Sequence, residues 1–550
     1  MKGQQRTRRR IWFVGVAAAL LIAAAAATAA FGGGAGHATS ATQSADTKTL
    51  VVAVPSDIQN LDPTLSSADV VTQELLTNVY DWLIDYKVVT QGGHQIGSPN
   101  QFVGAIAKSF SWNKSHTVVT FHLREGVKFA NGDPLDADAV KFTYDRIFKQ
   151  KGVTAALTAM AAVKSGSAVK VVNPTTVSFD LTKANNLLFG NMAQFGHSIL
   201  DPKVVQPHVT SADPYAHNWL GSNIDGTAQG PFQLESWQHG SQWVLTKNPN
   251  YYGQKPKVDK VIFKIIPNAS SRLALLKSGA VDIAYDLPLK DIKALQGSSS
   301  VQVIRYPSRF VVFLGMNSKV KPFNNVKVRQ AISYATPYKT IISQVLQGYG
   351  RQLTSPIPFG TPTHTDKYFV YKTDYVKAKQ LLAQAGYPNG FTTTLNVASG
   401  VDEGTETAVW VQQSLKKIGI KVQIQQLPGA NFTSRLQKHQ LGFFFFNNWI
   451  SINNDPFYHL FWLFRSDCCD YTNYSNKTVW KAIDSNLLSN NPTKRAAAAN
   501  ATQKQIMQDA PWVFLYQPDF VIAMRKNVHG YVYYSSDRFT RYKFLSKTAS

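Results

Sequence analysis

"TKNPNYYGQKPKVDKVIFKII", residues 246–266, joins two strand-like runs through a long turn. In the second run, Val261, Phe263 and Ile265 occupy alternate positions, which is the period of a β-strand. The turn is rich in Asn, Pro, Tyr, Gly and Lys, but it holds no acid–base pair, no set of metal ligands and no phosphate-binding loop. The stretch therefore predicts paired strands and offers no recognisable chemistry.

Strands and helices alternate on either side of this stretch. Residues 67–86 space their apolar side chains like a helix, and residues 442–449, "GFFFFNNW", are apolar on both faces, as in a buried strand. Such alternation favours an α/β fold with a mostly parallel sheet. The predicted strands are 49–56, 118–123, 175–181, three within 226–267, then 390–399, 419–427 and 442–449.

Helix starts are marked by capping residues. Asp136 and Asp374 stand where the first free backbone N–H groups of a helix need an acceptor. Thr336 and Pro337 predict a restart, with the threonine as N-cap and the proline in the first turn. A further helix is predicted over Thr405–Ile418. These signals place several helices in the second half of the chain.

The N-terminus has the three parts of an export signal. Residues 1–10 are basic, Ile11–Phe31 is an uncharged apolar run, and small polar residues follow. Cleavage after Ala29 or Ala38 fits this pattern, so 1–38 is predicted to be signal peptide and leader. The apolar run is also long enough to span a bilayer, and an uncleaved N-terminal anchor is the alternative. No cysteine lies near the run, which argues against a lipoprotein.

The composition is globular, with 44% hydrophobic and 12% aromatic residues. A net charge of +24 is compatible with an anionic polymer or a membrane surface as partner. The basic residues are scattered, however, and no recognition helix or basic–aromatic stripe accompanies them. We therefore expect no nucleic-acid partner.

The two cysteines, Cys468 and Cys469, are adjacent. No metal-binding pattern consists of two neighbouring thiols alone. Outside the cytoplasm the pair either closes a vicinal disulfide or stays as two thiols, and both alternatives are open.

Catalytic signatures are absent from the sequence. It contains no H-E-x-x-H, no G-x-S-x-G and no phosphate-binding G-x-x-x-x-G-K-[ST]. Asp455 and His459 are four residues apart, but a lone pair of this kind is more often a surface or core feature than a metal site. We expect no catalytic residues, no metal and no cofactor, so an exported binding protein is favoured over an enzyme.

Several long motifs follow one another along the chain. They include "VVAVPSDIQNLDP", "VTFHLREGVKFANGDPLDADAVKFTYDRI", "GPFQLESWQHGSQWVLTKNPNYYGQKPKVDKVIFKIIPNASSRLALLKSGAVDIA", "NDPFYHLF" and "DAPWVFLY". On these motifs, and over nearly everything after residue 48, the chain resembles the family 5 extracellular solute-binding proteins of ABC importers, of the dipeptide- and oligopeptide-binding type. The resemblance implies that the turn within 246–266 is scaffold.

The resemblance implies an α/β, two-lobed fold like that of periplasmic binding proteins, with an extra subdomain in the first lobe. The ligand is enclosed when the lobes close about a hinge of two chain crossings. We expect lobe one over 49–307, with the subdomain inserted near 86–205. Lobe two is expected over 308–510, and the chain then returns to lobe one over 511–546.

Peptide binders of this family hold the α-amino group with an aspartate three residues before the aspartate of the "NDP" segment. Here that position is Ile452. An ordinary zwitterionic peptide is therefore expected to bind weakly, unless Asp455, Asp57 or Asp286 takes the anchor's place. The resemblance leaves open a peptide, a peptide-like solute, an oligosaccharide or a metal chelate as ligand.

The residues predicted to contact the ligand come from the "NDP" loop and from the segments expected at the hinge. Gln229 is added because it stands before Gly-Pro, where the family usually has a small hydroxyl residue, and Asp57 because it is a candidate substitute anchor. Trp449 and the asparagines are also compatible with packing and turn roles. The complete set is Asp57, Gln229, Tyr285, Arg309, Phe310, Trp449, Asn453, Asn454 and Asp455.

The functional expectation is a monomeric importer subunit that delivers a small solute to an ABC permease complex in the membrane. It would reside in the periplasm or extracellularly at the cell surface. A secreted enzyme and a polyanion-binding surface protein are the less favoured alternatives.

Overall fold

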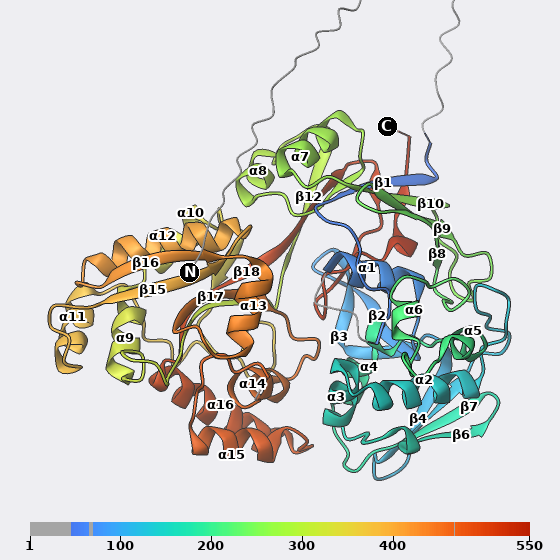
Figure 1. Ribbon diagram of the computed structural model, residues 1–550, viewed down its shortest axis with the longest axis horizontal. Helices are drawn as coiled ribbons and strands as arrows, with labels where there is room; N and C mark the ends of the chain where they lie inside the picture. The colour runs from blue at the N-terminus through green and yellow to red at the C-terminus, as the bar shows by residue number, and fades with distance from the viewer. Residues whose placement is uncertain (1–45, 65–69, 467, 550) are drawn as a thin grey trace, which may run out of the picture. The chain divides into compact units, whose positions relative to one another are not determined.

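A mixed sheet of twelve strands runs through the residues that the computed structural model describes, which are 46–64, 70–466 and 468–549 (Figure 1). The strand order is β16-β15-β17-β13-β18-β11-β1-β10-β9-β8, and β12 and β14 also pair with β18. The strands are β1 (Thr49–Val54), β8 (Phe232–Gln238), β9 (Gln242–Lys247), β10 (Lys260–Ile265), β11 (Ile283–Ala284), β12 (Val301–Pro307), β13 (Val311–Met316), β14 (Gly350–Gln352), β15 (Thr392–Ala398), β16 (Lys421–Leu427), β17 (Phe443–Trp449) and β18 (Trp512–Arg525).

The stretch 246–266 ends one strand of this sheet and contains the next. β9 and β10 pair antiparallel, with Trp243 opposite Phe263, and their rings stack at 4.9 Å. Val261 and Phe263 are buried whereas Lys264 is exposed, as the alternation in the sequence predicts. β8 pairs antiparallel with β9, so the three strands predicted within 226–267 are confirmed.

The prediction of a mostly parallel sheet is wrong. Among the described strands of the large sheet, parallel pairs join β1 to β10 and β11, and β15 to β16 and β17. The other pairs are antiparallel. Residues 239–241 are too short a link to join parallel strands, which need a crossover, so β8 and β9 form a hairpin.

The long strand β18 belongs to two hydrophobic cores. Its residues Trp512 to Tyr516 pair with β13 and pack in the core of the second half of the chain. Beyond Pro518 it pairs with β12 and β11, and Ile522 and Met524 pack in the core built around β1 and β10. The chain therefore passes from one core to the other within β18. It does so a second time in the β12–β13 link, and these two segments are called the chain passages.

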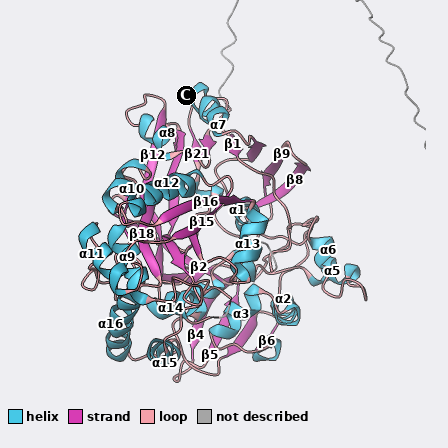
Figure 2. Ribbon diagram, turned by 60° about the vertical axis from the view of Figure 1, so that its left-hand side comes forward, coloured by secondary structure: helices cyan, strands magenta, loops and turns pink. Residues whose placement is uncertain are grey.

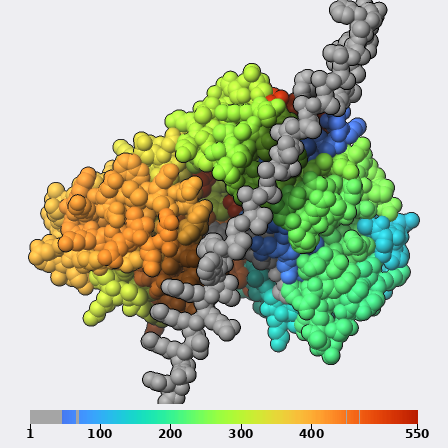
Figure 3. Space-filling model, turned by 45° about the horizontal axis from the view of Figure 1, so that its top comes forward, coloured from blue at the N-terminus to red at the C-terminus, as the bar shows by residue number. Residues whose placement is uncertain are grey.

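The hydrophobic core of the second half of the chain, built around β13, β15, β17 and the first part of β18, is called the second core, and helices pack against its strands. Figure 3 shows this part of the chain, in yellow to orange, gathered beside the blue to green residues of the first half. α12 contacts β15, β16 and β17, and Figure 2 shows the helices around the magenta strands. The helices of this part are α9 (Val326–Ala335), α10 (Tyr338–Gln344), α11 (Tyr375–Gln384), α12 (Asp402–Lys416), α13 (Gly429–Gln437), α14 (Pro456–Phe464), α15 (Lys477–Asn486) and α16 (Pro492–Asp509).

A third core forms around a four-stranded sheet of order β4-β5-β7-β6. Separate small sheets are β2-β3-β20 and β19-β21. The strands outside the large sheet are β2 (Ile84–Gln91), β3 (His94–Gly104), β4 (Ala107–Trp112), β5 (Val118–Leu123), β6 (Val169–Asn173), β7 (Thr176–Asp180), β19 (Val528–His529), β20 (Val532–Tyr534) and β21 (Ser546–Lys547). The helices of the first half are α1 (Val70–Val79), α2 (Ala137–Gln150), α3 (Val153–Met160), α4 (Leu188–Met192), α5 (Pro202–Val205), α6 (His217–Leu220), α7 (Ala269–Ser278) and α8 (Leu289–Ala294).

The helix predicted over 67–86 is shorter than expected. α1 ends at Val79, and β2 begins at Ile84. The carbonyl of Val79 accepts a hydrogen bond from the backbone N–H of Gly230 at 2.8 Å instead of continuing the helix. A Cβ on Gly230 would lie 2.5 Å from the carbonyl carbon of Val79, so this close approach requires glycine.

Two predicted caps are confirmed and one is wrong. The carboxylates of Asp136 and Asp374 accept from Ala139 N–H at 3.1 Å and Lys377 N–H at 2.9 Å. Thr336, predicted as the N-cap of α10, instead donates its hydroxyl to the carbonyl of Ile332 at 2.9 Å, back into α9. Threonine near a helix end often makes this i−4 bond, and Pro337 occupies the N-cap of α10. The helix predicted over Thr405–Ile418 is α12, which begins three residues earlier.

Candidate functional site

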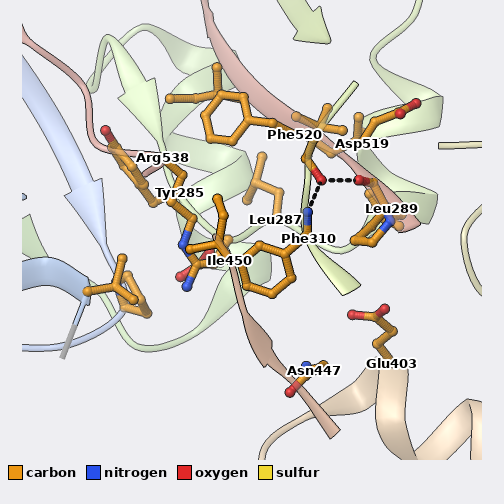
Figure 4. Close-up of a pocket in the computed structure, with 18 of the residues that line it drawn as sticks. Tyr285, Leu287, Leu289, Phe310, Glu403, Asn447, Ile450, Asp519, Phe520 and Arg538 are labelled. Carbon is orange, nitrogen blue, oxygen red and sulfur yellow. Dashed lines mark hydrogen bonds between the residues drawn. The ribbon is translucent and has the colours of Figure 1, made fainter. Parts of the chain in front are cut away.

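A cavity of about 280 Å³ lies where the segments that connect the cores meet (Figure 4). Its walls come from the end of β1, the start of α1, the β11–α8 connection, the β12–β13 link, the middle of β18, the end of β17, the start of α12 and two residues near the C-terminus, Tyr533 and Arg538. The lining residues are Val54, Pro55, Val70, Val71, Glu74, Tyr285, Asp286, Leu287, Leu289, Ile292, Ser308, Phe310, Val312, Glu403, Asn447, Ile450, Pro518, Asp519, Phe520, Val521, Ile522, Tyr533 and Arg538.

Two of the predicted ligand-contact residues, Tyr285 and Phe310, line this cavity. Phe310 sits in the β12–β13 link, where its backbone N–H donates to Ser308 Oγ at 3.1 Å. The Ser308 hydroxyl in turn donates to the Pro518 carbonyl at 2.5 Å. Figure 4 shows these two bonds as dashed lines. They fix the link against β18, so the Phe310 ring is held at the cavity wall.

Tyr285 belongs to a buried polar cluster around Glu74. The hydroxyls of Tyr285 and Tyr542 donate to the two carboxylate oxygens at 2.9 and 2.7 Å, and the Thr540 N–H donates at 3.1 Å. Burial raises the pKa of Glu74 to about 7, against the lowering effect of these bonds. The cluster joins α1 to the C-terminal segment and holds the phenol of Tyr285 in place.

Glu403, at the start of α12, brings a carboxylate to the opposite wall. Figure 4 shows its side chain extending from the helix toward the cavity, on the side of Phe310 and Leu289. Its Oε1 is buried and has no hydrogen-bond partner among the described residues, while the Tyr516 hydroxyl bonds to the same carboxylate. Burial raises the pKa of Glu403 above its usual value.

Two other charged groups of the lining have partners, whereas Asp286 is exposed to solvent. Asp519 forms an ion pair with Arg305, with Nη2 to Oδ2 at 2.5 Å. The guanidinium of Arg538 lies over the ring of Phe310, 5.1 Å from its centroid, which is a cation–π geometry. The cavity thus combines aromatic and aliphatic walls with four carboxyl groups and one guanidinium.

Arg309, also predicted to contact the ligand, is directed away from this cavity. Its Nη2 donates to the carbonyls of Ser451 and Ser535, each at 3.1 Å. The side chain is buried, and Nη1 has no partner in the part of the chain that the structure describes. Arg309 therefore ties the loop after β17 to the C-terminal segment rather than lining the candidate site.

Three further predicted residues do not line the cavity. Gln229 is fully buried and donates Nε2 to the carbonyl of Asp81 at 2.8 Å. Asp57 accepts from the Trp237 indole at 2.9 Å and the Gly240 N–H at 2.8 Å. Trp449 packs between two cores and donates Nε1 to His459 Nδ1 at 3.1 Å. Their positions support packing and hydrogen-bonding roles in place of the predicted ligand contact.

Asn453, Asn454 and Asp455 line a second cavity, of about 540 Å³. Its walls are the loop before α14, the start of α16 and parts of β3, β4 and α4. Asn453 donates to the side-chain oxygen of Asn191, and Asn454 donates to that of Asn100 at 2.9 Å. The asparagines thus join the loop to the third core, so the structure separates them from Tyr285 and Phe310.

Asp455 and Ile452 are engaged in the same loop. Asp455 caps α14 by accepting from the N–H groups of Phe457 and Tyr458 at 2.8 and 3.0 Å, and it forms an ion pair with Arg495. Ile452 packs against the third core, and its carbonyl accepts from the Tyr86 hydroxyl at 3.0 Å. Neither side chain is in the lining of the first cavity.

Sequence reasoning missed Glu403, Asn447, Asp519 and Arg538. Glu403 lies in "VDEGTETAV", where an acidic residue in a first helical turn usually interacts with the helix dipole, so nothing in the sequence distinguished it. The approach of Arg538 and α12 to the same space depends on long-range packing. Only the predicted hinge positions of Tyr285 and Phe310 indicated this region in advance.

Four further observations concern the cysteine pair, metal binding, membrane-spanning helices and the predicted leader. Cys468 and Cys469 are joined as a disulfide in the structure, with their sulfur atoms 2.12 Å apart. Within residues 46–64, 70–466 and 468–549, no group of three His, Cys, Asp or Glu side chains has the arrangement of a metal site. No helix among these residues has the length and apolarity to cross a membrane. The predicted leader, 1–38, lies outside the described residues.

Comparison with known proteins gives consistent matches over most of the chain. "Probable D,D-dipeptide-binding periplasmic protein DdpA" from Escherichia coli K12 is 32% identical over 490 residues, 88% of this chain and 91% of that protein. Glutathione-binding protein GsiB from the same strain is 27% identical over 495 residues, 88% and 92% of the two chains.

Among solved structures, periplasmic binding protein DppA from Helicobacter pylori, in complex with the peptide STSA, superposes with a TM-score of 0.78. It is 25% identical, and the match covers 91% of this chain and 98% of that one. The model of the bacterial extracellular solute-binding proteins, family 5, matches residues 101–468. With its two-lobed α/β fold, the chain belongs to the family 5 bacterial extracellular solute-binding proteins.

Proposed function

We propose that this chain is the solute-binding subunit of an ABC importer. It captures a peptide or peptide-like solute in the cavity at Tyr285 and Phe310 and delivers the solute to membrane permeases. One observation carries the proposal. β18 and the β12–β13 link are the segments where the chain passes from one core to the other, and the cavity has walls from both sides of these segments. The names of the relatives, which refer to dipeptides and glutathione, support a peptide-like ligand.

The cavity dimensions favour a small solute. Its volume of about 280 Å³ is at the lower end of the roughly 300–1,000 Å³ usual for small-molecule sites. A dipeptide or an amino-acid derivative is compatible with that space, whereas a long peptide would have to extend beyond it. An oligosaccharide or a metal chelate is the alternative ligand class. The aromatic rings Phe310, Phe520 and Tyr533 would support stacking with a sugar ring.

The α-amino group of the solute is not held at position 452. Ile452 is apolar and packs against the third core. Of the acids that sequence reasoning offered in its place, Asp57 and Asp455 have other partners, and Asp286 lies at the exposed edge of the cavity. We propose that these acids do not supply an amine anchor of the usual family kind.

The division into lobes follows from the same account. We propose lobe one over 49–307 with a subdomain near 86–205, and lobe two over 308–510. The return to lobe one lies within 511–546, and the exchange of cores inside β18 supports a passage there. The protein is exported, by the signal proposed for 1–38, acts as a monomer and has no catalytic function.

Native mass spectrometry tests the proposed function. Protein freed of ligand by unfolding and refolding is incubated with yeast extract, desalted and weighed. One small adduct per chain is expected. The variant Asn447→Trp, which fills the cavity, is expected to lose the adduct, and Gln423→Trp, on the exposed side of β16, serves as control. Absence of any adduct on the unaltered protein, or its persistence at full occupancy in Asn447→Trp, would contradict the proposal.

A further inference from the structure

The charges of the interlobe cavity are unbalanced. Its lining holds four carboxyl groups, from Glu74, Asp286, Glu403 and Asp519, but a single guanidinium, from Arg538. Glu74 accepts three hydrogen bonds from its cluster, and Asp519 is paired with Arg305 outside the lining. Arg538 is placed over the ring of Phe310. Asp286 and Glu403 remain against the single guanidinium of Arg538, so the lining keeps an excess of negative charge.

Glu403 is the half-buried carboxylate with free capacity in this set, since Asp286 is exposed to solvent. One oxygen of Glu403 is buried without a hydrogen-bond partner among the described residues, and the nearby Tyr516 hydroxyl lowers the pKa of the carboxyl against the effect of burial. A carboxylate oxygen that is closed off from water without a donor is costly, because its lost hydration is not replaced. The Glu403 side chain lines the cavity, and a carboxylate with an unmatched oxygen in a cavity wall is the arrangement expected of a group whose partner arrives with the ligand.

The groups around Glu403 indicate the chemistry of that partner. Phe310 and Leu289 supply apolar walls on its side of the cavity (Figure 4), and Val312 is a further apolar lining residue. Glu406, three residues further along the same helix, is exposed and adds negative potential. Arg538 lowers the pKa of Glu403 through space, but no ion pair between the two is formed in the structure. A small, positively charged hydrogen-bond donor on the ligand fits these surroundings of Glu403.

We propose that the cavity selects solutes with a cationic group, an ammonium or a guanidinium, beside an apolar part, and that Glu403 is the residue that pairs with the cation. The charge-assisted hydrogen bond forms in a site shielded from water, where such bonds are strong. The apolar part of the solute packs against Phe310 and the neighbouring aliphatic residues. This inference rests on the proposed function, because it names the class of solute for the same cavity.

The cationic group has two sources, a basic side chain or the α-ammonium of a free peptide. A basic side chain agrees with the absence of an amine anchor at Ile452. An α-ammonium at Glu403 would move the amine site from the loop after β17 to the start of α12, and would show that the expectation of weak binding for zwitterionic peptides is wrong. Matched probes distinguish the sources, since citrulline replaces arginine with little change of shape and N-acetylation removes the α-charge.

The experiment begins with the adducts captured from yeast extract. They are released and identified by high-resolution mass spectrometry, and calorimetry is then performed with three pairs: Leu-Arg against Leu-citrulline, Leu-Lys against Leu-norleucine, and Leu-Leu against N-acetyl-Leu-Leu. Each is measured on the unaltered protein and on Glu403→Gln, with Glu406→Gln as the control that removes one charge from the exposed face of the same helix. Circular dichroism and melting temperature verify that the variants are folded.

We expect the captured solutes to carry a basic group. We also expect the affinity for the cationic member of at least one pair to be about tenfold or more higher than for its neutral counterpart. Glu403→Gln should reduce that preference to within about twofold to threefold, and Glu406→Gln should retain it. The pair that responds identifies the source of the cation.

Two results would overturn the inference while leaving the proposed function intact. One is capture of solutes without a basic group together with equal affinity within every pair. The other is a cation preference that Glu403→Gln leaves unchanged. Absence of any captured solute would instead contradict the proposed function and this inference with it.

Discussion

Arg495 and Asp455 form a buried ion pair that fixes the start of α16 against the start of α14. The same aspartate caps α14, because its Oδ1 accepts from the N–H groups of Phe457 and Tyr458. Arg495 also donates to the carbonyls of Leu487 and Ser489, each at 3.2 Å. An acid of the "NDP" segment that sequence reasoning offered as a ligand anchor thus has a structural role in the second core.

Removal of that acid should destabilise the protein strongly. Asp455→Ala leaves the guanidinium of Arg495 buried without its counter-ion and also removes a helix cap, so we expect a loss of about 3–5 kcal/mol. Asp455→Asn retains an acceptor for the cap and should lose less. Urea unfolding followed by circular dichroism measures both variants. Equal, small losses of under about 1 kcal/mol would contradict the role assigned to the pair.

The buried carboxyl of Glu74 should make stability fall between pH 5 and pH 8. Its folded-state pKa of about 7 lies above its ordinary value of 4.5, so the folded state binds the proton more tightly than the unfolded state. The stability that this proton contributes is complete below the unfolded pKa and is lost as the pH rises through 7. The shift corresponds to about 3 kcal/mol across that window.

Glu74→Gln removes the titration and should flatten this part of the stability profile. Denaturation at a series of pH values compares it with the unaltered protein and with Glu235→Gln, a change at an exposed acid on β8. If Glu74→Gln and Glu235→Gln show the same slope from pH 5 to pH 8, the buried carboxyl does not have the shifted pKa described here.

Cys468 and Cys469 should be unreactive toward thiol reagents in the purified protein. The structure joins them as a disulfide, and the chain has no other cysteine. Labelling of unfolded, unreduced protein with iodoacetamide should add no label, and labelling after reduction should add two. Two labels without reduction would mean that the bond is absent.

An aspartate at position 452 should not create an amine site of the usual family kind. The Ile452 side chain packs against the third core and is not part of the cavity lining, so a carboxylate there would face apolar neighbours. We expect Ile452→Asp to cost roughly 1–3 kcal/mol of stability. Ile452→Val, which removes one methylene, should cost about 0.5–1.5 kcal/mol.

Calorimetry of Ile452→Asp with Leu-Leu and N-acetyl-Leu-Leu completes the test. No gain in affinity for the free peptide relative to the acetylated one is expected. A gain of tenfold or more would mean that position 452 faces the solute after all.

The secondary structure was predictable where local signals and tertiary packing agree. The alternation in 246–266, the apolar run of β17 and the caps at Asp136 and Asp374 all correspond to elements of the structure. The errors arose where distant residues decide the outcome. Gly230 ends α1 by taking the Val79 carbonyl, and β18 makes much of the large sheet antiparallel by returning from the second core.

The candidate site was less predictable, because its walls are assembled from segments separated by hundreds of residues. Tyr285 and Phe310 were found through their expected hinge position, whereas Glu403 and Arg538 carry no local signal. Tryptophan is a residue type that often stacks on ligands, but Trp449 lies where two cores make contact. Residue type alone does not separate these cases; three-dimensional position does.

The central claim is that the solute binds between Tyr285, Phe310 and Glu403. A crystal structure of the protein with the solute captured from yeast extract tests it most directly. The account predicts electron density for one small molecule in contact with the Phe310 ring and within hydrogen-bond distance of the Glu403 carboxylate. Density in the second cavity, at Asn453 and Asn454, with the first cavity empty would contradict it.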